Sequence, residues 1–185
     1  MTDIFTPEQR HIVMSHIRSK DTRPELLVRR FLHRHGIRYS LHVKQLPGHP
    51  DIVLRKYHTI ILVNGCFWHG HGFNSNLLPL QHENPQCSFF RLPYTNTDFW
   101  QKKIERNICR DEKQHKELTE MGWNVITIWE CQLRSAEREN TLFGLLRTLN
   151  QILMKNMGVH LTYHADEEDD TMPRAAESDS VIESN

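Results

Sequence analysis

The chain is organised around one run of sequence, the apolar segment Thr59-Ile60-Ile61-Leu62-Val63 followed directly by Asn64-Gly65-Cys66-Phe67-Trp68-His69-Gly70-His71. The apolar segment has the length and the β-branched content of a buried strand. The eight residues after it hold a thiol, two imidazoles and two large aromatic rings. Because ligands of open α/β sheets bind beyond the carboxyl ends of strands, we expect the functional site to lie here.

Length and cysteine content favour a single domain in a reducing compartment. At 185 residues, the chain is long enough to bury its own core without disulfide bonds. It has neither an apolar run of about 18 residues nor a hydrophobic N-terminal signal segment, which predicts a cytoplasmic protein with no membrane span. In that compartment its four cysteines are more typical of metal ligands than of disulfides.

The net charge of zero conceals two oppositely charged parts. Residues 165–185 hold eight acidic residues and one basic residue out of 23 of each in the chain, which leaves a body of about +7. We expect residues 1–164 to form one domain and residues 165–185 to be an acidic, disordered tail. A positive body suits a phosphate-containing partner, although a solvated surface with a solubilising tail is an equally ordinary interpretation.

Helix signals recur along the chain. Thr6-Pro7-Glu8 places a hydroxyl at the N-cap and proline at the first helical position, which predicts a helix to about Ser19. Thr22-Arg23-Pro24-Glu25 repeats the signal for a helix that ends before Gly36. Two further helices are expected from Thr97 to Met121 and from Thr141 to Met157.

Strand signals predict a mixed sheet with helices on its faces. The expected strands are 38–43, 51–55, 59–63 and 124–129, of which the second and third form a hairpin. The fold class is therefore α/β. Between the third strand and the following helix, residues 72–97 form a long loop rich in proline and asparagine.

Two acids stand out by position. Asp51 opens an apolar strand, where a carboxylate needs water, a positive group or a metal beside it, and Mg²⁺ prefers such an oxygen. Glu25 lies in the first turn of its predicted helix. A capping or dipole role is the ordinary interpretation of Glu25, and a catalytic role stays open.

Three cysteines and a histidine could form a closed Cys₃His zinc site, composed of Cys66, His71, Cys87 and Cys131. Their spacing matches no common zinc finger, so scattered buried cysteines are an alternative. His69, His82 and Cys109 compete as ligands. A metal bound at Cys87 would hold the 72–97 loop in place.

Several motifs in one order then resemble a known family. They are Pro47-Gly48-His49-Pro50-Asp51, Gly65 to His71, Thr97-Asp98-Phe99-Trp100, Asn107 with Arg110-Asp111, Gly122-Trp123 and Trp129-Glu130-Cys131. Together they are similar to the very short patch repair endonucleases, the Vsr type, from about Arg10 to Arg134. The resemblance implies a restriction-endonuclease-like fold related to the PD-(D/E)xK nucleases.

The resemblance also implies an activity and its residues. The family nicks DNA 5′ to the thymine of a T:G mismatch left by deamination of 5-methylcytosine. Asp51 would bind the catalytic Mg²⁺, as would the backbone carbonyl of Val63, and His69 would be the general base. Glu25 and Asp111 match acids that the family places around the metal-bound waters.

The remaining roles follow in the same way. Cys66, His71, Cys87 and Cys131 match the ligands of a structural Zn²⁺. Phe67, Trp68 and Trp100 match aromatic side chains that wedge into DNA beside the mismatch, whereas burial in the core is the ordinary interpretation of such residues.

The chain departs from the family pattern at two places. Asn64 stands where the family commonly has a histidine that assists at the scissile phosphate, and asparagine cannot supply a proton at neutral pH. The stretch between His71 and Cys87 is about fourteen residues longer than the family pattern leads us to expect.

The prediction is therefore a Mg²⁺-dependent mismatch nicking endonuclease with a structural zinc site. Its expected partners are a mismatched DNA duplex, a functionally linked cytosine-5 methyltransferase and downstream mismatch-repair proteins. We expect a monomer associated with a bacterial nucleoid. The alternatives are a non-catalytic zinc-containing DNA-binding module, which would not need Asp51 or His69, and a T:G mismatch glycosylase, which would not need Mg²⁺.

Overall fold

The computed structural model describes Thr6, Glu8, Gln9, Ile12, Ser15 and the ranges 20–73 and 87–158. Most of the first predicted helix, much of the 72–97 loop and the acidic tail lie outside the described residues. At the start of the chain, Gln9 N donates to Thr6 Oγ1 (3.3 Å) and Thr6 N donates to Gln9 Oε1 (3.0 Å). These two reciprocal bonds form a capping box, as expected at the start of the helix predicted there.

A four-stranded mixed sheet forms the centre of the fold. Its strands are β1 (Ser40–Leu41), β2 (Ile52–Leu54), β3 (Thr59–Asn64) and β4 (Asn124–Trp129), in the order β1-β2-β3-β4. β2 and β3 pair as an antiparallel hairpin, and β4 lies parallel to β3 with Asn64 opposite Trp129. The predicted hairpin and mixed sheet are confirmed. Because β3 and β4 are parallel and in register, the residues that follow them meet at one edge.

Helix α2 (Arg23–Arg34) begins with a capping box. Glu25 N donates to Thr22 Oγ1 and Thr22 N donates to Glu25 Oε2, both at 3.4 Å. These bonds satisfy backbone donors that have no partner within the helix. The helix ends before Gly36, whose φ of +72° suits glycine.

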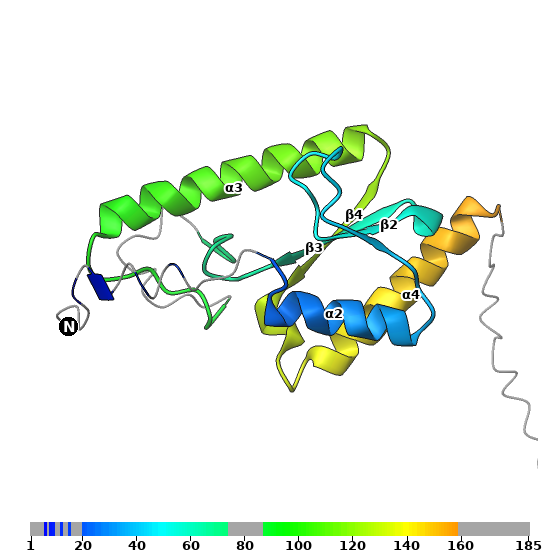
Figure 1. Ribbon diagram of the computed structural model, residues 1–185, viewed down its shortest axis with the longest axis horizontal. Coiled ribbons are helices and arrows are strands. Elements are labelled where there is room, and N and C mark those ends of the chain that lie inside the picture. Colours follow the sequence, from blue (N-terminus) through cyan, green and yellow to red (C-terminus); the bar gives the residue numbers. More distant parts are fainter. Residues whose placement is uncertain are drawn as a thin grey trace, which may run out of the picture.

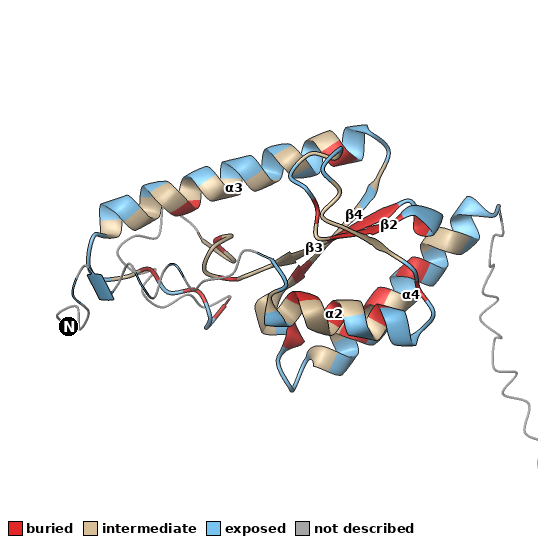
Figure 2. Ribbon diagram, in the orientation of Figure 1, coloured by how far each residue is buried: buried red, intermediate tan, exposed pale blue. Residues whose placement is uncertain are grey.

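The two faces of the sheet are covered by different helices. In Figure 1, α2 and α4 (Arg138–Asn156) lie together on one side of the sheet, and α3 (Thr97–Glu120) runs along the other. On the first side, Val28 and Leu32 of α2 and Leu145 and Leu149 of α4 belong to the same buried cluster as strand residues such as Ile61. Figure 2 shows the buried faces of α2 and α4. The sheet is thus enclosed between two layers of helices.

Helix α3 extends past the sheet and covers a separate cluster. Its C-terminal Leu118 packs with Val53 and Ile60 of the sheet. Its N-terminal half instead contributes Ile104 to a buried group with Cys66, Cys87, Phe90 and Leu92. One long helix therefore joins the sheet to the segment after β3.

Two elements differ from the prediction by more than one residue at a boundary, β1 and α4. β1 is shorter than 38–43, because His42 has a φ of +44° and leaves the extended conformation. α4 begins at Arg138 rather than at Thr141, and its first turn includes the bond from Thr141 N to Glu137 O. No helix among the described residues is both long and apolar enough to cross a membrane.

Candidate active site and metal centre

A cleft with a volume of about 870 Å³ opens where α2 begins, β2 begins and β3 ends, and α3 forms its far wall. Its lining brings together four carboxylates from four separate segments, namely Glu25, Asp51, Asp111 and Glu130. His49, His69 and Arg110 also line it, together with Val63, Asn64 and Trp68. A group of oxygen and imidazole donors in one concave site could hold a divalent cation.

Asp51 is fixed by the hairpin partner of its strand. Its Oδ2 accepts a hydrogen bond of 2.9 Å from Val63 N on β3. Burial raises the pKa of the Asp51 carboxyl above its ordinary value, and the negative charge of Glu25 adds to this, while the bond from Val63 and the imidazoles of His42 and His69 oppose it. A cation beside Asp51 would offset the cost of keeping this carboxylate charged.

Glu25 is both a helix cap and a wall of the cleft. Its side chain is only 2% exposed, and Oε1 accepts a bond of 2.9 Å from Arg29 on the next helical turn. His42 Nε2 lies 3.4 Å from the same oxygen, outside hydrogen-bond geometry. The position of Glu25 is therefore compatible both with a capping role at the start of α2 and with a role in the active site.

His69 is held by an acid on α3. His69 Nδ1 lies 2.5 Å from Asp111 Oδ2, and Arg110 donates to Asp111 Oδ1 at 3.2 Å. Burial acts to raise the pKa of Asp111, but the bonds from His69 and Arg110 outweigh it and leave this pKa below its ordinary value. Asp111 therefore stays ionised and orients the imidazole.

The segment after β3 folds into consecutive turns against α3. His69 N donates to Gly65 O (3.1 Å) and His71 N donates to Cys66 O (2.9 Å). Asn107, one turn before Asp111, donates to the carbonyl of Trp68 at 2.8 Å. Asn107 and Asp111, four residues apart, thus lie on the same side of α3 and bind the segment at Trp68 and His69.

Gly70 permits the close approach of this segment to α3. It has a φ of +61°, and a Cβ atom there would lie 2.7 Å from Ile108 and 2.8 Å from Ile104. A side chain at this position would force the side chains of Ile104 and Ile108, or the segment itself, to shift, and it would also have to adopt a positive φ.

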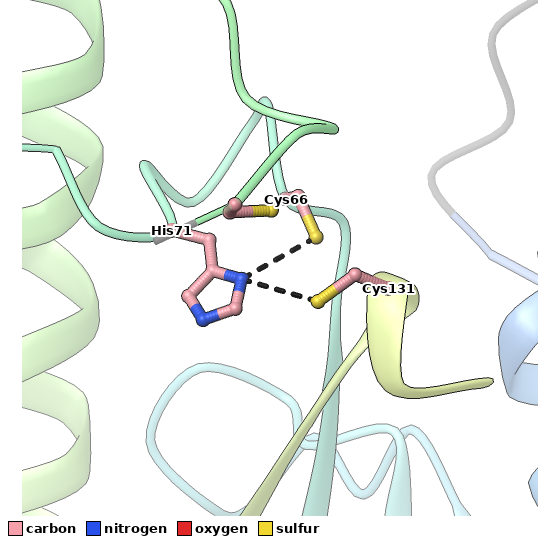
Figure 3. Close-up of side chains that lie close together, drawn as sticks. Cys66, His71 and Cys131 are labelled. Atoms are coloured by element: carbon pink, nitrogen blue, oxygen red, sulfur yellow. Dashed lines mark hydrogen bonds between the residues drawn. The ribbon is translucent and has the colours of Figure 1, made fainter. Parts of the chain in front are cut away.

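The predicted Cys₃His set is brought together. One ligand atom from each of Cys66, His71, Cys87 and Cys131 lies within 4.8 Å of the others. Figure 3 shows His71 Nδ1 facing two thiols, at 3.6 Å from Cys66 Sγ and 3.4 Å from Cys131 Sγ. The rings of His71 and Trp129 stack with centroids 4.1 Å apart, which fixes the imidazole.

The chemistry of the cluster suits a soft metal ion. Burial raises the pKa of the Cys66 and Cys131 thiols and lowers the pKa of His71, so the uncharged forms are favoured until a cation binds. None of the four cysteines forms a disulfide, and Cys109, the one cysteine outside the cluster, is exposed on α3. The cluster could therefore bind a metal.

The three predicted DNA wedges form one aromatic group beside the cleft. Ring centroids are 5.0 Å apart for Phe67 and Trp68, 5.2 Å for Phe67 and Trp100, and 6.1 Å for Trp68 and Trp100. All three side chains are half-buried, so they are neither core residues nor free surface residues. Lys103 Nζ lies 5.4 Å from the Trp68 ring and 5.3 Å from the Trp100 ring, within cation–π range.

Glu130 and His42 were assigned no role from the sequence. Glu130 lines the cleft because β4 ends beside β3, and its position directly after a predicted strand was an available signal. His42 lies near Glu25 because a left-handed residue turns the chain there. Nothing in the local sequence pattern indicates that contact.

Comparison with known proteins gives consistent matches. The family model described as DNA mismatch endonuclease Vsr matches residues 2–75. A type II nicking enzyme of Neisseria meningitidis, V.NmeAIP, is 45% identical over 135 residues, which are 73% of this chain and 86% of that protein. The nicking enzyme V.XorIIP of Xanthomonas oryzae is 43% identical over 133 residues, 72% of this chain and 88% of that protein. The DNA mismatch endonuclease Vsr of Escherichia coli K12 is 34% identical over 138 residues, which are 75% of this chain and 80% of that protein.

Proposed function

The chain belongs to the Vsr family of DNA mismatch endonucleases, and we propose that it nicks double-stranded DNA 5′ to the thymine of T:G mismatches, with Mg²⁺ in the cleft and Zn²⁺ in the cysteine cluster. The membership makes it a DNA-cleaving hydrolase. We propose further that its mixed sheet and helices form a restriction-endonuclease-like fold within one domain, residues 1–164, followed by the acidic tail 165–185.

The observation that carries the proposal is the meeting of Asp51, Glu25 and the His69–Asp111 pair in one cleft. Phosphodiester hydrolysis needs a deprotonated water, charge neutralisation on the phosphate and a stabilised leaving oxygen. A bound Mg²⁺ supplies charge neutralisation and acidifies the attacking water. Asp51 and the backbone carbonyl of Val63 are its proposed ligands, with Glu25 and Asp111 near the waters.

His69 is the proposed general base. With Nδ1 hydrogen-bonded to the Asp111 carboxylate, the neutral ring carries its proton on that nitrogen and leaves Nε2 to accept one. Asp111 also stabilises the imidazolium that forms when the proton arrives. Asn64 lines the same cleft but cannot transfer a proton, so His69 acts without a second imidazole at that position.

The geometry of the cysteine cluster supports zinc. With Zn–S and Zn–N bonds of about 2.3 and 2.0–2.1 Å, a tetrahedral site separates sulfur from nitrogen by about 3.5 Å. The distances from His71 Nδ1 to the sulfurs of Cys66 and Cys131, 3.6 and 3.4 Å, bracket that value. Zn²⁺ would brace the segment that carries His69, two residues from His71.

The aromatic group of Phe67, Trp68 and Trp100 is the proposed wedge. Its half-buried rings support one another and adjoin the cleft, and Lys103 places a positive charge over two of them. Wedging apolar rings between base steps costs least where pairing is already weakened, which favours a mismatch. A cytosine-5 methyltransferase and downstream repair proteins are the proposed functional partners of a monomeric enzyme acting in the nucleoid.

One assay separates this activity from the alternatives. A labelled duplex with a single T:G pair is incubated with the full chain and Mg²⁺, and the product ends are mapped, with a T:A duplex as control. A nick with a 5′-phosphate on the thymine supports the proposal. An abasic site formed without Mg²⁺ would identify a glycosylase, and stable binding without any product would identify a non-catalytic module.

A further inference from the structure

A second hollow borders the cleft between α2 and the start of α4, and its lining is strongly basic. It has a volume of about 810 Å³ and is lined by four arginines, Arg23, Arg30, Arg34 and Arg138, against the single acid Asp21. Leu26, Leu27, Phe31 and Leu142 form its apolar part. Thr22 lines both this hollow, the arginine groove, and the cleft.

Three of the arginines form a row along α2. Arg30 follows Arg23 by seven residues and Arg34 follows Arg30 by four. These intervals are close to two turns and one turn of helix, so the three side chains project from one stripe, about 10 and 6 Å apart along the axis. The row begins at the helix end that forms part of the cleft and leads away from it.

The charges of this row are not neutralised by the protein that the structure describes. Arg23, Arg30 and Arg34 are exposed, and within the described residues no carboxylate forms an ion pair with them. Asp21, the acid of the groove, is instead bound by Arg29 at 2.5 Å. Arg138 lines the groove from the start of α4, where its Nε donates to Leu133 O at 3.1 Å.

Isolated surface arginines are ordinary on an amphipathic helix, but this set lies in a concave surface. Hollows lined by one sign of charge concentrate the field of those charges and attract ions of the opposite sign. The guanidinium fork matches the oxygens of a phosphate group better than an ammonium does. Repeated phosphates at short intervals are therefore the ligand that fits the row.

We propose that the arginine groove binds the phosphate backbone of the duplex that flanks the nicking site. The proposal rests on the proposed function in that DNA is the substrate, but it does not depend on which mismatch is cut. Contacts to backbone phosphates add affinity and fix the register of the protein on DNA without reading sequence. The groove thus lengthens the DNA footprint beyond the cleft.

The test compares two double variants with equal changes of charge. Arg30→Glu/Arg34→Glu reverses the row, and Arg55→Glu/Lys56→Glu reverses two exposed charges in the short helix at the far end of β2. Fluorescence anisotropy measures the binding of each full-length protein to two mismatch-containing duplexes at several salt concentrations. One duplex ends close to the mismatch and the other extends about two helical turns on both sides.

The wild type should gain affinity on the longer duplex. The groove variant should lose this gain, about 10-fold or more in dissociation constant, and the slope of log K against log salt should become shallower by about 2. The matched control should bind the longer duplex as the wild type does. Equal losses in both variants, or no loss in the groove variant, would overturn the proposal.

Tighter binding by the groove variant would also overturn it, since the arginines would then be holding the acidic tail rather than DNA. Nicking is measured separately on the short duplex, where the matched control Arg55→Glu/Lys56→Glu should keep the wild-type rate. If the wild type nicks no T:G duplex at all, the proposed function fails while the dependence of binding on duplex length still decides the role of the groove.

Discussion

His69 Nδ1 lies 2.5 Å from Asp111 Oδ2, although the two residues are 42 positions apart and belong to different elements. One follows β3 and the other lies in the middle of α3. The contact exists because α3 extends beyond the sheet and Asn107 and Gly70 let it dock against the turns after β3. The proposed general base is therefore oriented by the helix that also supports the aromatic group.

Replacing Asp111 with asparagine should lower the nicking rate about 10- to 100-fold, because the imidazole loses its carboxylate partner. Replacing His69 with alanine should cost about 10²- to 10⁴-fold. Since both act through one imidazole, the double variant should be no slower than His69→Ala. Single-turnover nicking rates measure all three, with Glu112→Gln, an exposed neighbour, as the control. A wild-type rate in Asp111→Asn would show that the pair does not serve catalysis.

Asp51→Asn should raise the free energy of unfolding at pH 7 in the absence of divalent cations. The folded-state pKa of Asp51 is raised chiefly by burial, so the charged carboxylate costs stability above that pKa, and this cost disappears as the pH falls toward the unfolded value of about 3.9. Asparagine can still accept the bond from Val63 N. Urea unfolding at a series of pH values should therefore show the largest gain at neutral pH and none below about pH 4.

The same experiment with Mg²⁺ provides the control. Mg²⁺ at about 100 times its dissociation constant should stabilise the wild type by about 2.7 kcal/mol and Asp51→Asn by much less. If Asp51→Asn is less stable than the wild type at pH 7 without Mg²⁺, the raised pKa of Asp51 is contradicted. If Mg²⁺ stabilises the two proteins equally, the placement of a cation at Asp51 is contradicted.

Cys131→Ser should remove bound zinc and destabilise the protein by on the order of 3–5 kcal/mol, because a structural metal contributes directly to folding. The matched control is Cys109→Ser, whose thiol is exposed on α3 and outside the cluster. Elemental analysis of the purified proteins measures metal content, and thermal unfolding measures stability. Equal zinc content in the two variants would show that Cys131 is not a ligand.

Asn64→His should accelerate nicking, by about 10- to 100-fold in a single-turnover assay, because an imidazole at the end of β3 can donate a proton in the cleft and an amide cannot. Asn64→Gln keeps the amide and is the control for side-chain size. No acceleration in Asn64→His would mean that the enzyme does not lack a second proton-transfer group.

The elements of the fold could be predicted because their signals are local. Thr22 and Glu25 signalled the capping box at the start of α2, and β-branched runs signalled β3 and β4. The three polar residues 138–140 gave no apolar signal, so the start of α4 was placed too late. β1 was predicted too long because the left-handed conformation of His42 has no signal in the sequence.

The site was only partly predictable for a different reason. Cys66 and His71 are close in sequence, but their approach to Cys87 and Cys131 depends on β4 lying parallel to β3 and on the packing of α3. The bond between Asn107 and the Trp68 carbonyl and the approach of His42 to Glu25 depend likewise on tertiary packing. Residue types in the sequence indicate which chemistry is available, whereas packing decides which side chains meet.

The most direct test of the proposed active site is the Mg²⁺-dependent nicking of a T:G duplex by the wild type and by Asp51→Asn. The variant keeps the size of the side chain and the bond from Val63, so loss of activity cannot be attributed to a lost contact between β2 and β3. We predict one nick on the 5′ side of the thymine by the wild type and a rate at least about 10³-fold lower in the variant. Equal nicking by the two proteins would contradict the assignment of the cleft as the active site.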